Sequence, residues 1–214
     1  MLGNDIVDLA DPESSCGGQH PRFDRRVFSR CERAALSQSP DPTRARWVLW
    51  AVKESAFKGL RRARPDTVFS PVRFVVDLDS QLRGSVTYRD TRYSATVEMD
   101  RDCVHAIVSD DSAPAGTLWG SRRITDDSIA SQQVRALALD RIADRLGIDR
   151  SDLSIDRVGR IPHLVHRGER TMATLSLSHH GSYVGFACRL APWSVATADL
   201  PSPRLQQSLE RATH

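Results

Sequence analysis

Two short segments near the N-terminus carry side chains that could bind a cation and a phosphate. Glu54 and Lys58 are four residues apart in the segment WAVKESAFK, so a helix would place them on one face about one turn apart. Asp5 begins an apolar run that is typical of a short strand. Mg²⁺ prefers one or two carboxylates together with substrate oxygens and water. We therefore predict that the strand acid and the helical acid–amine pair hold a hard cation and a phosphate between them.

Each of these features has a simpler interpretation when it is taken alone. A Glu and a Lys four residues apart on a helix are by default a solvated pair that contributes about 0.2–0.5 kcal/mol. An aspartate such as Asp5 can cap a turn or a helix. The combination of the two segments, in this order, is what favours a functional site.

Three short motifs resemble those of the phosphopantetheinyl transferase superfamily. Its members carry a Gly-x-Asp strand, a Trp-x-x-Lys-Glu-x-x-x-Lys helix and a Ser-x-Ser-His segment, which match residues 3–5, 50–58 and 176–179. The resemblance implies Mg²⁺-dependent transfer of 4′-phosphopantetheine from coenzyme A to a serine of an acyl or peptidyl apo-carrier protein. It thus implies an enzyme with holo-acyl-carrier-protein synthase activity that releases 3′,5′-ADP.

The resemblance also implies roles for individual residues. Asp5 and Glu54 would be the Mg²⁺ ligands, Glu54 also the base, and Lys58 the catalytic cation. The coenzyme A contacts would be Lys53, Lys58, Arg160, Ser178 and His179. Two-lobed members usually place a third acid two residues after the aspartate, but Val7 stands there, so we expect water to complete the metal site. Asp8 should point to the opposite face of a regular strand.

The rest of the chain runs twice from helix to strands, which predicts the α+β fold class. Helical periodicity covers 23–36 and 44–62, and strand patterns follow around 72–76, 84–88, 93–97 and 104–108. After a linker over 110–127, a helix over 128–146 precedes strands around 153–155, 175–177 and 183–188.

The family resemblance implies two similar α+β lobes related by a pseudo-two-fold axis. A metal-site lobe would span 1–110, a lobe with coenzyme A-binding loops 125–192, and a C-terminal tail 193–214. Surfactin-synthetase-type members place the metal-site lobe second, so the lobes here would be in permuted order. Holo-acyl-carrier-protein synthases share the motif order of this chain but use a single lobe. A single-lobe synthase with a large insertion is therefore the alternative; a two-lobed chain would hold its active site alone, as a monomer.

Arginines are concentrated in the first expected helix. Arg22, Arg25 and Arg26 resemble the carrier-docking helix of holo-acyl-carrier-protein synthases. Carrier proteins are acidic around the modified serine, so a basic helix would attract them over a distance. A solvated helix face is the alternative interpretation.

Composition limits the partners and the compartment that we expect. The chain has 214 residues, 27% of them charged, and a net charge of only +3, without a recognised nucleic-acid motif. Its four cysteines lack paired spacing, which indicates reduced thiols in the cytoplasm. No apolar stretch approaches the roughly 20 residues that span a bilayer. We expect a cytoplasmic protein that binds neither nucleic acid nor membrane.

A protein that keeps the fold and binds coenzyme A or carriers without turnover is the alternative function. Such a protein has no need of Asp5, Glu54 and Lys58 together, and their retention favours catalysis. A hydrolase is disfavoured because adjacent residues such as Ser178 and His179 point to opposite faces of a strand and no Gly-x-Ser-x-Gly segment occurs.

Overall fold

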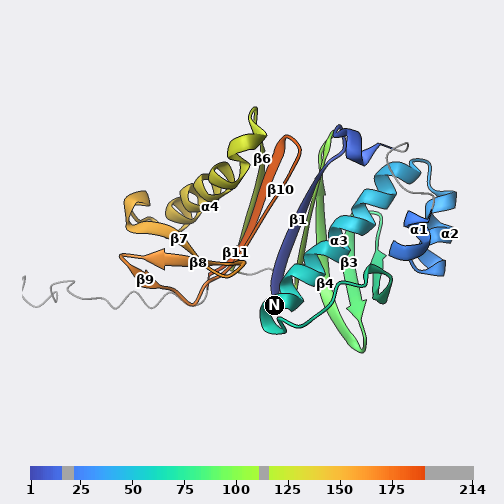
Figure 1. Cartoon of the computed structure of the whole chain (residues 1–214), viewed down its shortest axis with the longest axis horizontal. Coiled ribbons are helices and arrows are strands. Elements are labelled where there is room, and N and C mark those ends of the chain that lie inside the picture. Colours follow the sequence, from blue (N-terminus) through green and yellow to red (C-terminus); the bar gives the residue numbers. More distant parts are fainter. Residues whose placement is uncertain (16–21, 111–115, 191–214) are drawn as a thin grey trace, which may run out of the picture.

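The first half of the chain forms a five-stranded antiparallel sheet that is covered on one face by a long helix (Figure 1). The computed structural model describes residues 1–15, 22–110 and 116–190. The strand order is β1-β5-β4-β3-β2, with β1 (Leu2–Asp8), β2 (Phe74–Leu78), β3 (Arg83–Tyr88), β4 (Thr91–Met99) and β5 (Cys103–Ser109). The helical elements are η1 (Pro12–Ser14), α1 (Phe23–Val27), α2 (Arg30–Gln38), α3 (Pro42–Ala63) and η2 (Pro71–Arg73). We call residues 1–110 the first lobe.

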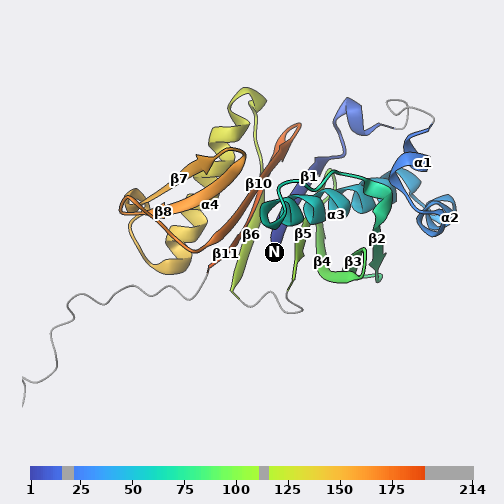
Figure 2. The same cartoon turned by 60° about the horizontal axis from the view of Figure 1, so that its bottom comes forward.

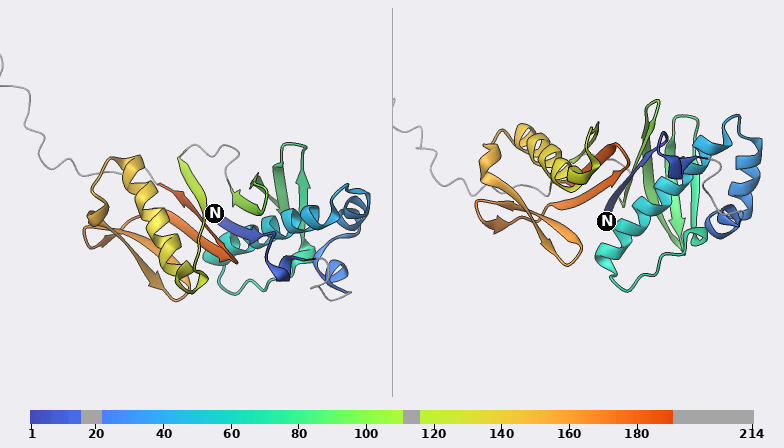
Figure 3. Two further views of the ribbon diagram at one scale, coloured as in Figure 1. Left: turned by 90° about the horizontal axis from the view of Figure 1, so that it is seen from above. Right: turned by 45° about the horizontal axis from the view of Figure 1, so that its top comes forward.

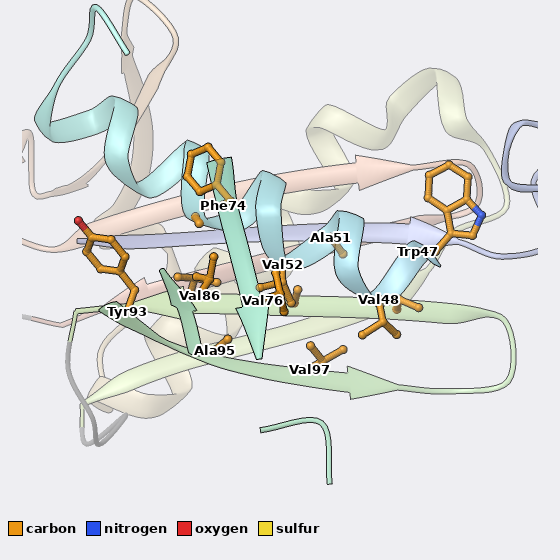
Figure 4. Close-up of a cluster of buried hydrophobic side chains, with 14 of the residues drawn as sticks. Trp47, Val48, Ala51, Val52, Phe74, Val76, Val86, Tyr93, Ala95 and Val97 are labelled. Carbon is orange, nitrogen blue, oxygen red and sulfur yellow. The ribbon is translucent and has the colours of Figure 1, made fainter. Parts of the chain in front are cut away.

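The long helix α3 forms where the sequence supplies a capped start and a continuous apolar face. The Asp41 side chain accepts a hydrogen bond from the Arg44 amide at 2.9 Å, and Pro42 occupies the first turn, where it costs no helical hydrogen bond. The apolar face packs on the sheet in a buried cluster that includes Trp47, Val48, Ala51, Val52, Val76, Val86 and Val97 (Figure 4). The helix predicted over 44–62 is confirmed as Pro42–Ala63.

A glycine allows β1 to lie directly against α3. A Cβ atom on Gly3 would lie 2.0 Å from the Ser55 carbonyl oxygen and 2.7 Å from the Gly59 amide nitrogen. Any side chain at this position would therefore push the strand and the helix apart. Asp5 follows on the same face of the strand. The glycine of the Gly-x-Asp motif thus brings the aspartate next to the helix that carries Glu54.

The second half of the chain repeats this order of elements in two smaller sheets (Figures 2 and 3). One sheet has the order β10-β11-β6 and the other the order β7-β8-β9. The strands are β6 (Thr117–Arg123), β7 (Leu153–Val158), β8 (Ile161–His166), β9 (Glu169–Arg170), β10 (Thr174–His180) and β11 (Tyr183–Arg189). The helical elements are η3 (Asp127–Ile129), α4 (Ala130–Leu146) and η4 (Arg150–Asp152). We call residues 116–190 the second lobe.

The strands pair in the same way in both lobes. β6 pairs with β11 and β11 with β10, just as β1 pairs with β5 and β5 with β4. The hairpin β7–β8 corresponds to the hairpin β2–β3. Helix α4 packs on its sheet through Ala138 and Ile142, which share a buried cluster with Leu175 and Phe186. This repeated topology agrees with the expected α+β fold of two similar lobes.

Reciprocal contacts fasten the two lobes together. Asn4 of β1 reaches across to β10, where its Nδ2 donates a hydrogen bond to Ser178 Oγ at 2.7 Å. Trp119 of β6 reaches back to β4, where its Nε1 donates to Glu98 Oε1 at 2.7 Å. Contacts made in both directions by the equivalent strands are what a pseudo-two-fold arrangement predicts.

Several sequence-based boundaries are wrong. The single helix expected over 23–36 is two helices, because Ser29 starts α2 with a capping box that Glu32 completes. The linker expected over 110–127 contains β6, which pairs with β11, so the expected start of the second lobe at residue 125 is too late. The strand expected at 72–76 begins only at Phe74, after η2. The strands β8 and β9 were not expected, and the tail 193–214 lies outside the described residues.

Within the described ranges, no helix is long and apolar enough to cross a membrane.

Candidate functional site

The structure brings Asp5, Glu54 and Lys58 together between β1 and α3. Lys58 Nζ lies 2.5 Å from Asp5 Oδ1, and the Asp5 side chain is mostly buried while that of Lys58 is about one-third exposed. Glu54 lies one helical turn before Lys58 and is partly buried. The predicted cluster is therefore present.

The electrostatics of this cluster centre on Glu54. Burial and the nearby negative charge of Asp5 raise the pKa of Glu54 to about 7, although Lys58 acts in the opposite direction. Two neighbouring carboxylates are the kind of donor set that a divalent cation binds. Asp5 and Glu54 could thus hold a hard cation.

A cavity of about 440 Å³ opens between the C-terminal end of α3 and the strands β8 and β10. Its charged lining is entirely basic and consists of Lys58, Arg61, Arg62 and Arg160. The described lining contains no aspartate or glutamate; the remaining residues are mostly apolar, such as Leu2, Ile161 and Leu175. Such a cavity is suited to an anion with an apolar part.

Two of these arginines were missed by the sequence reasoning. Arg61 and Arg62 follow Lys58 by three and four residues, so they continue the same helix face into the last turn of α3. This spacing was a visible signal, but only the structure shows that β8 and β10 face it. Arg160, in contrast, was predicted as a coenzyme A contact, and it lines the same cavity as Lys58.

Lys53, which we expected to contact coenzyme A, is instead enclosed in the first lobe. Its side chain is 0% exposed, and its Nζ donates to both carboxylate oxygens of Glu32 at 2.9 Å. It also donates to the carbonyl oxygens of Pro71 and Phe74, while Glu32 Oε1 accepts from the Val76 amide at 2.9 Å. The prediction for Lys53 is therefore wrong, because its side-chain hydrogen bonds join α3 to α2, η2 and β2.

Ser178 and His179 also lie away from the cavity lining. Ser178 is buried between the lobes, where its Oγ accepts from Asn4 Nδ2 and donates to the Gly185 carbonyl at 3.3 Å. His179 is exposed on the other face of β10. In this structure Ser178 joins the two lobes, so a contact with coenzyme A is not supported for it, and His179 stays a prediction.

The three predicted docking arginines are exposed on and next to α1. This short helix is held against α3 by Asp24, whose two carboxylate oxygens accept from Arg46 at 2.8 and 2.9 Å. Phe23 of α1 also packs on Trp47 and Trp50 of α3. Helix α1, on and next to which these arginines lie, is thus at the N-terminal end of α3 (Figure 1).

A second group of possible metal ligands lies beyond the end of β1, where ligand atoms come within 4.8 Å of one another in Asp11, Glu13 and His180. The His180 Nδ1 accepts a hydrogen bond from the Asp8 amide at 3.1 Å. The neutral ring therefore carries its proton on Nε2 and has no free lone pair to offer. Asp8 itself points away from Asp5, as predicted, and accepts from the amides of Ala10 and Ser182. This group fits a metal ion less well than Asp5 and Glu54.

Comparison with known families agrees with the geometry. Residues 1–108 match the model of the 4′-phosphopantetheinyl transferase superfamily, and the chain belongs to this superfamily. The matched part contains β1, α3 and the whole Asp5, Glu54 and Lys58 cluster. Phosphopantetheinyl transfer, with coenzyme A and a carrier protein as substrates and a divalent metal as cofactor, is the general activity of the family. No curated protein matches the sequence.

Proposed function

We propose that this chain transfers 4′-phosphopantetheine from coenzyme A to a serine of an acidic apo-carrier protein and releases 3′,5′-ADP. The observation that carries the proposal is the meeting of Asp5, Glu54 and Lys58 next to a cavity whose charged lining is entirely basic. The carboxylates suit a cation, and the cavity suits the phosphates of coenzyme A.

The ion that Asp5 and Glu54 would hold is Mg²⁺. Carboxylate oxygens are its preferred protein ligands. Burial and then the charge of Asp5 raise the pKa of Glu54, and a divalent ion would offset the negative charge of the two carboxylates. Val7, at the place of a third acid, is 2% exposed in the apolar core, so it offers no ligand, and water would supply the remaining ligands of the ion. When bound, Mg²⁺ would neutralise charge on the pyrophosphate oxygens.

Glu54 is the base in this proposal. In the metal-free protein, burial and Asp5 raise its pKa to about 7, so Glu54 holds a proton more tightly than an ordinary glutamate does. Its carboxylate would accept the proton of the carrier serine as the serine oxygen attacks the phosphorus. Lys58, already paired with Asp5, would balance the charge on the transferred and leaving phosphates.

The basic cavity would hold the adenosine phosphates. Its volume of about 440 Å³ lies within the range of small-molecule sites, roughly 300–1,000 Å³. Arg61 on α3 and Arg160 just before β8 both line the cavity and would contribute positive charge to the phosphate site. The apolar lining residues offer contact area for the adenine ring.

The carrier protein would approach α1. Arg25 and Arg26 are exposed there, at the end of the helix that carries Glu54, and they would attract the acidic surface around the carrier serine.

Replacement of Glu54 by glutamine tests this function against the non-catalytic alternative. Glutamine keeps the size of the side chain but cannot accept a proton, so we expect transfer to fall by about 10²- to 10⁴-fold. Coenzyme A affinity should stay within about threefold of the wild type, because the basic cavity is unchanged. Release of 3′,5′-ADP and calorimetric titration with coenzyme A measure the two quantities. A wild-type protein that binds coenzyme A but never releases 3′,5′-ADP would favour the binding protein.

A further inference from the structure

An arginine of the first lobe fills a gap between two strands of the second lobe. In the first lobe β3 is paired with β4 along its whole length, from Tyr88–Thr91 to Arg83–Thr96. Their counterparts in the second lobe are β8 and the continuous stretch of β9 and β10. These pair only near their turn, as far as the hydrogen bond from the Thr171 amide to the Leu164 carbonyl at 2.9 Å.

The sequence explains why the pairing stops. The register Val165–Arg170, if continued, would place Pro162 opposite Ala173. Proline has no N–H group, so it cannot donate the hydrogen bond that this position of a ladder requires. Within the described residues, β10 then pairs with β11 alone.

The guanidinium of Arg62 bridges the two separated strands. Its Nη1 donates to the Leu175 carbonyl of β10 at 2.7 Å, and its Nη2 donates to the Pro162 carbonyl of β8 at 3.0 Å. The planar, forked guanidinium is the side-chain group that can satisfy two acceptors at a fixed distance. Among the described residues, Arg62 forms no ion pair with a carboxylate, so its positive charge is not neutralised there.

The bridge forms part of the cavity wall. Ile161 and Pro162 on one side, and Leu175 and Ser176 on the other, line the cavity together with Arg62. Pairing of β8 with β10, as in the first lobe, would bring these two sides together and remove the space between them.

We propose that Arg62 is a positioning residue: its guanidinium sets the separation of β8 and β10 that admits coenzyme A. It also ties this wall to α3, and thus to Glu54 and Lys58, so the phosphate cavity and the acidic cluster keep a fixed relation. The proposal rests on the proposed function, because it takes coenzyme A as the occupant of the cavity.

The variants Arg62→Met and Arg62→Lys separate bridging from charge. Methionine removes both, whereas lysine keeps the charge but lacks the planar fork. We expect both variants to weaken coenzyme A binding, measured by calorimetry without a carrier protein, by about tenfold or more. Arg64→Met is the matched control, since Arg64 is exposed at the end of α3 and does not line the cavity. It should bind within about twofold of the wild type.

Two further measurements report on the wall itself. Amide hydrogen exchange of 161–166 and 174–177 should become faster in both Arg62 variants and stay unchanged in Arg64→Met. In both Arg62 variants the KM for coenzyme A should rise by a larger factor than kcat at saturating coenzyme A falls, because Glu54 and Lys58 are still present.

An Arg62→Lys protein that matches the wild type in coenzyme A affinity and in exchange would overturn the proposal, since charge alone would then suffice. Unchanged exchange in both variants would overturn it as well. If Arg62→Met does not fold, the coenzyme A affinity and the hydrogen exchange of Arg62→Lys test the proposal. A wild type that binds coenzyme A but transfers nothing contradicts the proposed function. The role of Arg62 is then still tested by the coenzyme A affinities of the variants. A wild type that does not bind coenzyme A contradicts both.

Discussion

Glu54 is subject to opposing influences that suit a residue with two tasks. Burial and Asp5 favour its protonated form, and Lys58 favours the carboxylate, so that its pKa lies at about 7. In the proposed role of metal ligand it has to be ionised, and in the proposed role of base it has to accept a proton. In the metal-free protein the raised pKa stabilises the fold at low pH, and this contribution is lost as the pH rises through about 7.

We predict that Mg²⁺ binding releases a proton and strengthens as the pH rises from about 6 to about 8. The reason is that the ion binds the carboxylate of Glu54, which is largely protonated below its pKa of about 7. Calorimetric titrations in two buffers with different ionisation enthalpies measure the number of protons released. In Glu54→Gln the proton release should disappear. An identical release in that variant would show that another group titrates.

At the scale of elements, α3 connects every part of the site. One face carries Glu54 and Lys58 toward β1, its last turn carries Arg62 to the second lobe, and Lys53 faces α2 and β2. The two lysines of one motif therefore have different tasks. Lys58 pairs with Asp5 in the proposed site, while Lys53 neutralises Glu32 and satisfies the backbone at the outer edge of β2.

We expect Lys53→Met to lower the free energy of unfolding by about 3–5 kcal/mol, because it leaves Glu32 buried without a counter-charge. Urea-induced unfolding measures this change. The double variant Lys53→Met with Glu32→Leu should recover part of the loss, since no charge then stays buried. Lys58→Met is the matched control, which should lose transfer activity with a much smaller loss of stability because its side chain is partly exposed. The reverse order of stabilities would contradict these assignments.

Elements with a clear periodicity could be predicted from the sequence, and others could not. α3 follows from its helical spacing of apolar residues, and β1 from its apolar run. The break between α1 and α2 was missed because Phe23, Val27 and Cys31 keep a helical spacing across it, although the Ser29–Glu32 capping box marks it. β6 was missed because its seven residues lie among turn-forming residues, and its pairing with β11 is a long-range contact.

At the scale of the whole molecule, both lobes contribute residues to the proposed site. The first lobe supplies Asp5, Glu54 and Lys58, and the second supplies Arg160 and the strands that wall the cavity. The acidic cluster could be predicted, because its members lie in local motifs. The structural roles of Lys53 and Ser178 could not be predicted, since burial against distant elements leaves no local signal in the sequence.

We predict that reversing the charge of the proposed docking surface weakens carrier recognition alone. The double variant Arg25→Glu with Arg26→Glu should raise the KM for the carrier by about tenfold or more, because it replaces attraction by repulsion. Coenzyme A affinity should not change. The matched control is Arg141→Glu with Arg145→Glu, which reverses the same charge on the exposed face of α4 in the second lobe. Steady-state kinetics at low and high salt check this, and equal effects of both double variants would contradict a specific docking site.

The most direct test of the proposed activity is the intact mass of apo-carrier proteins after incubation with the protein, coenzyme A and Mg²⁺. We predict that at least one acyl or peptidyl carrier gains the mass of one phosphopantetheine arm. The gain should disappear with EDTA and with Asp5→Ala, which removes a proposed metal ligand. No gain on any carrier, with coenzyme A still bound, would contradict the proposed transfer.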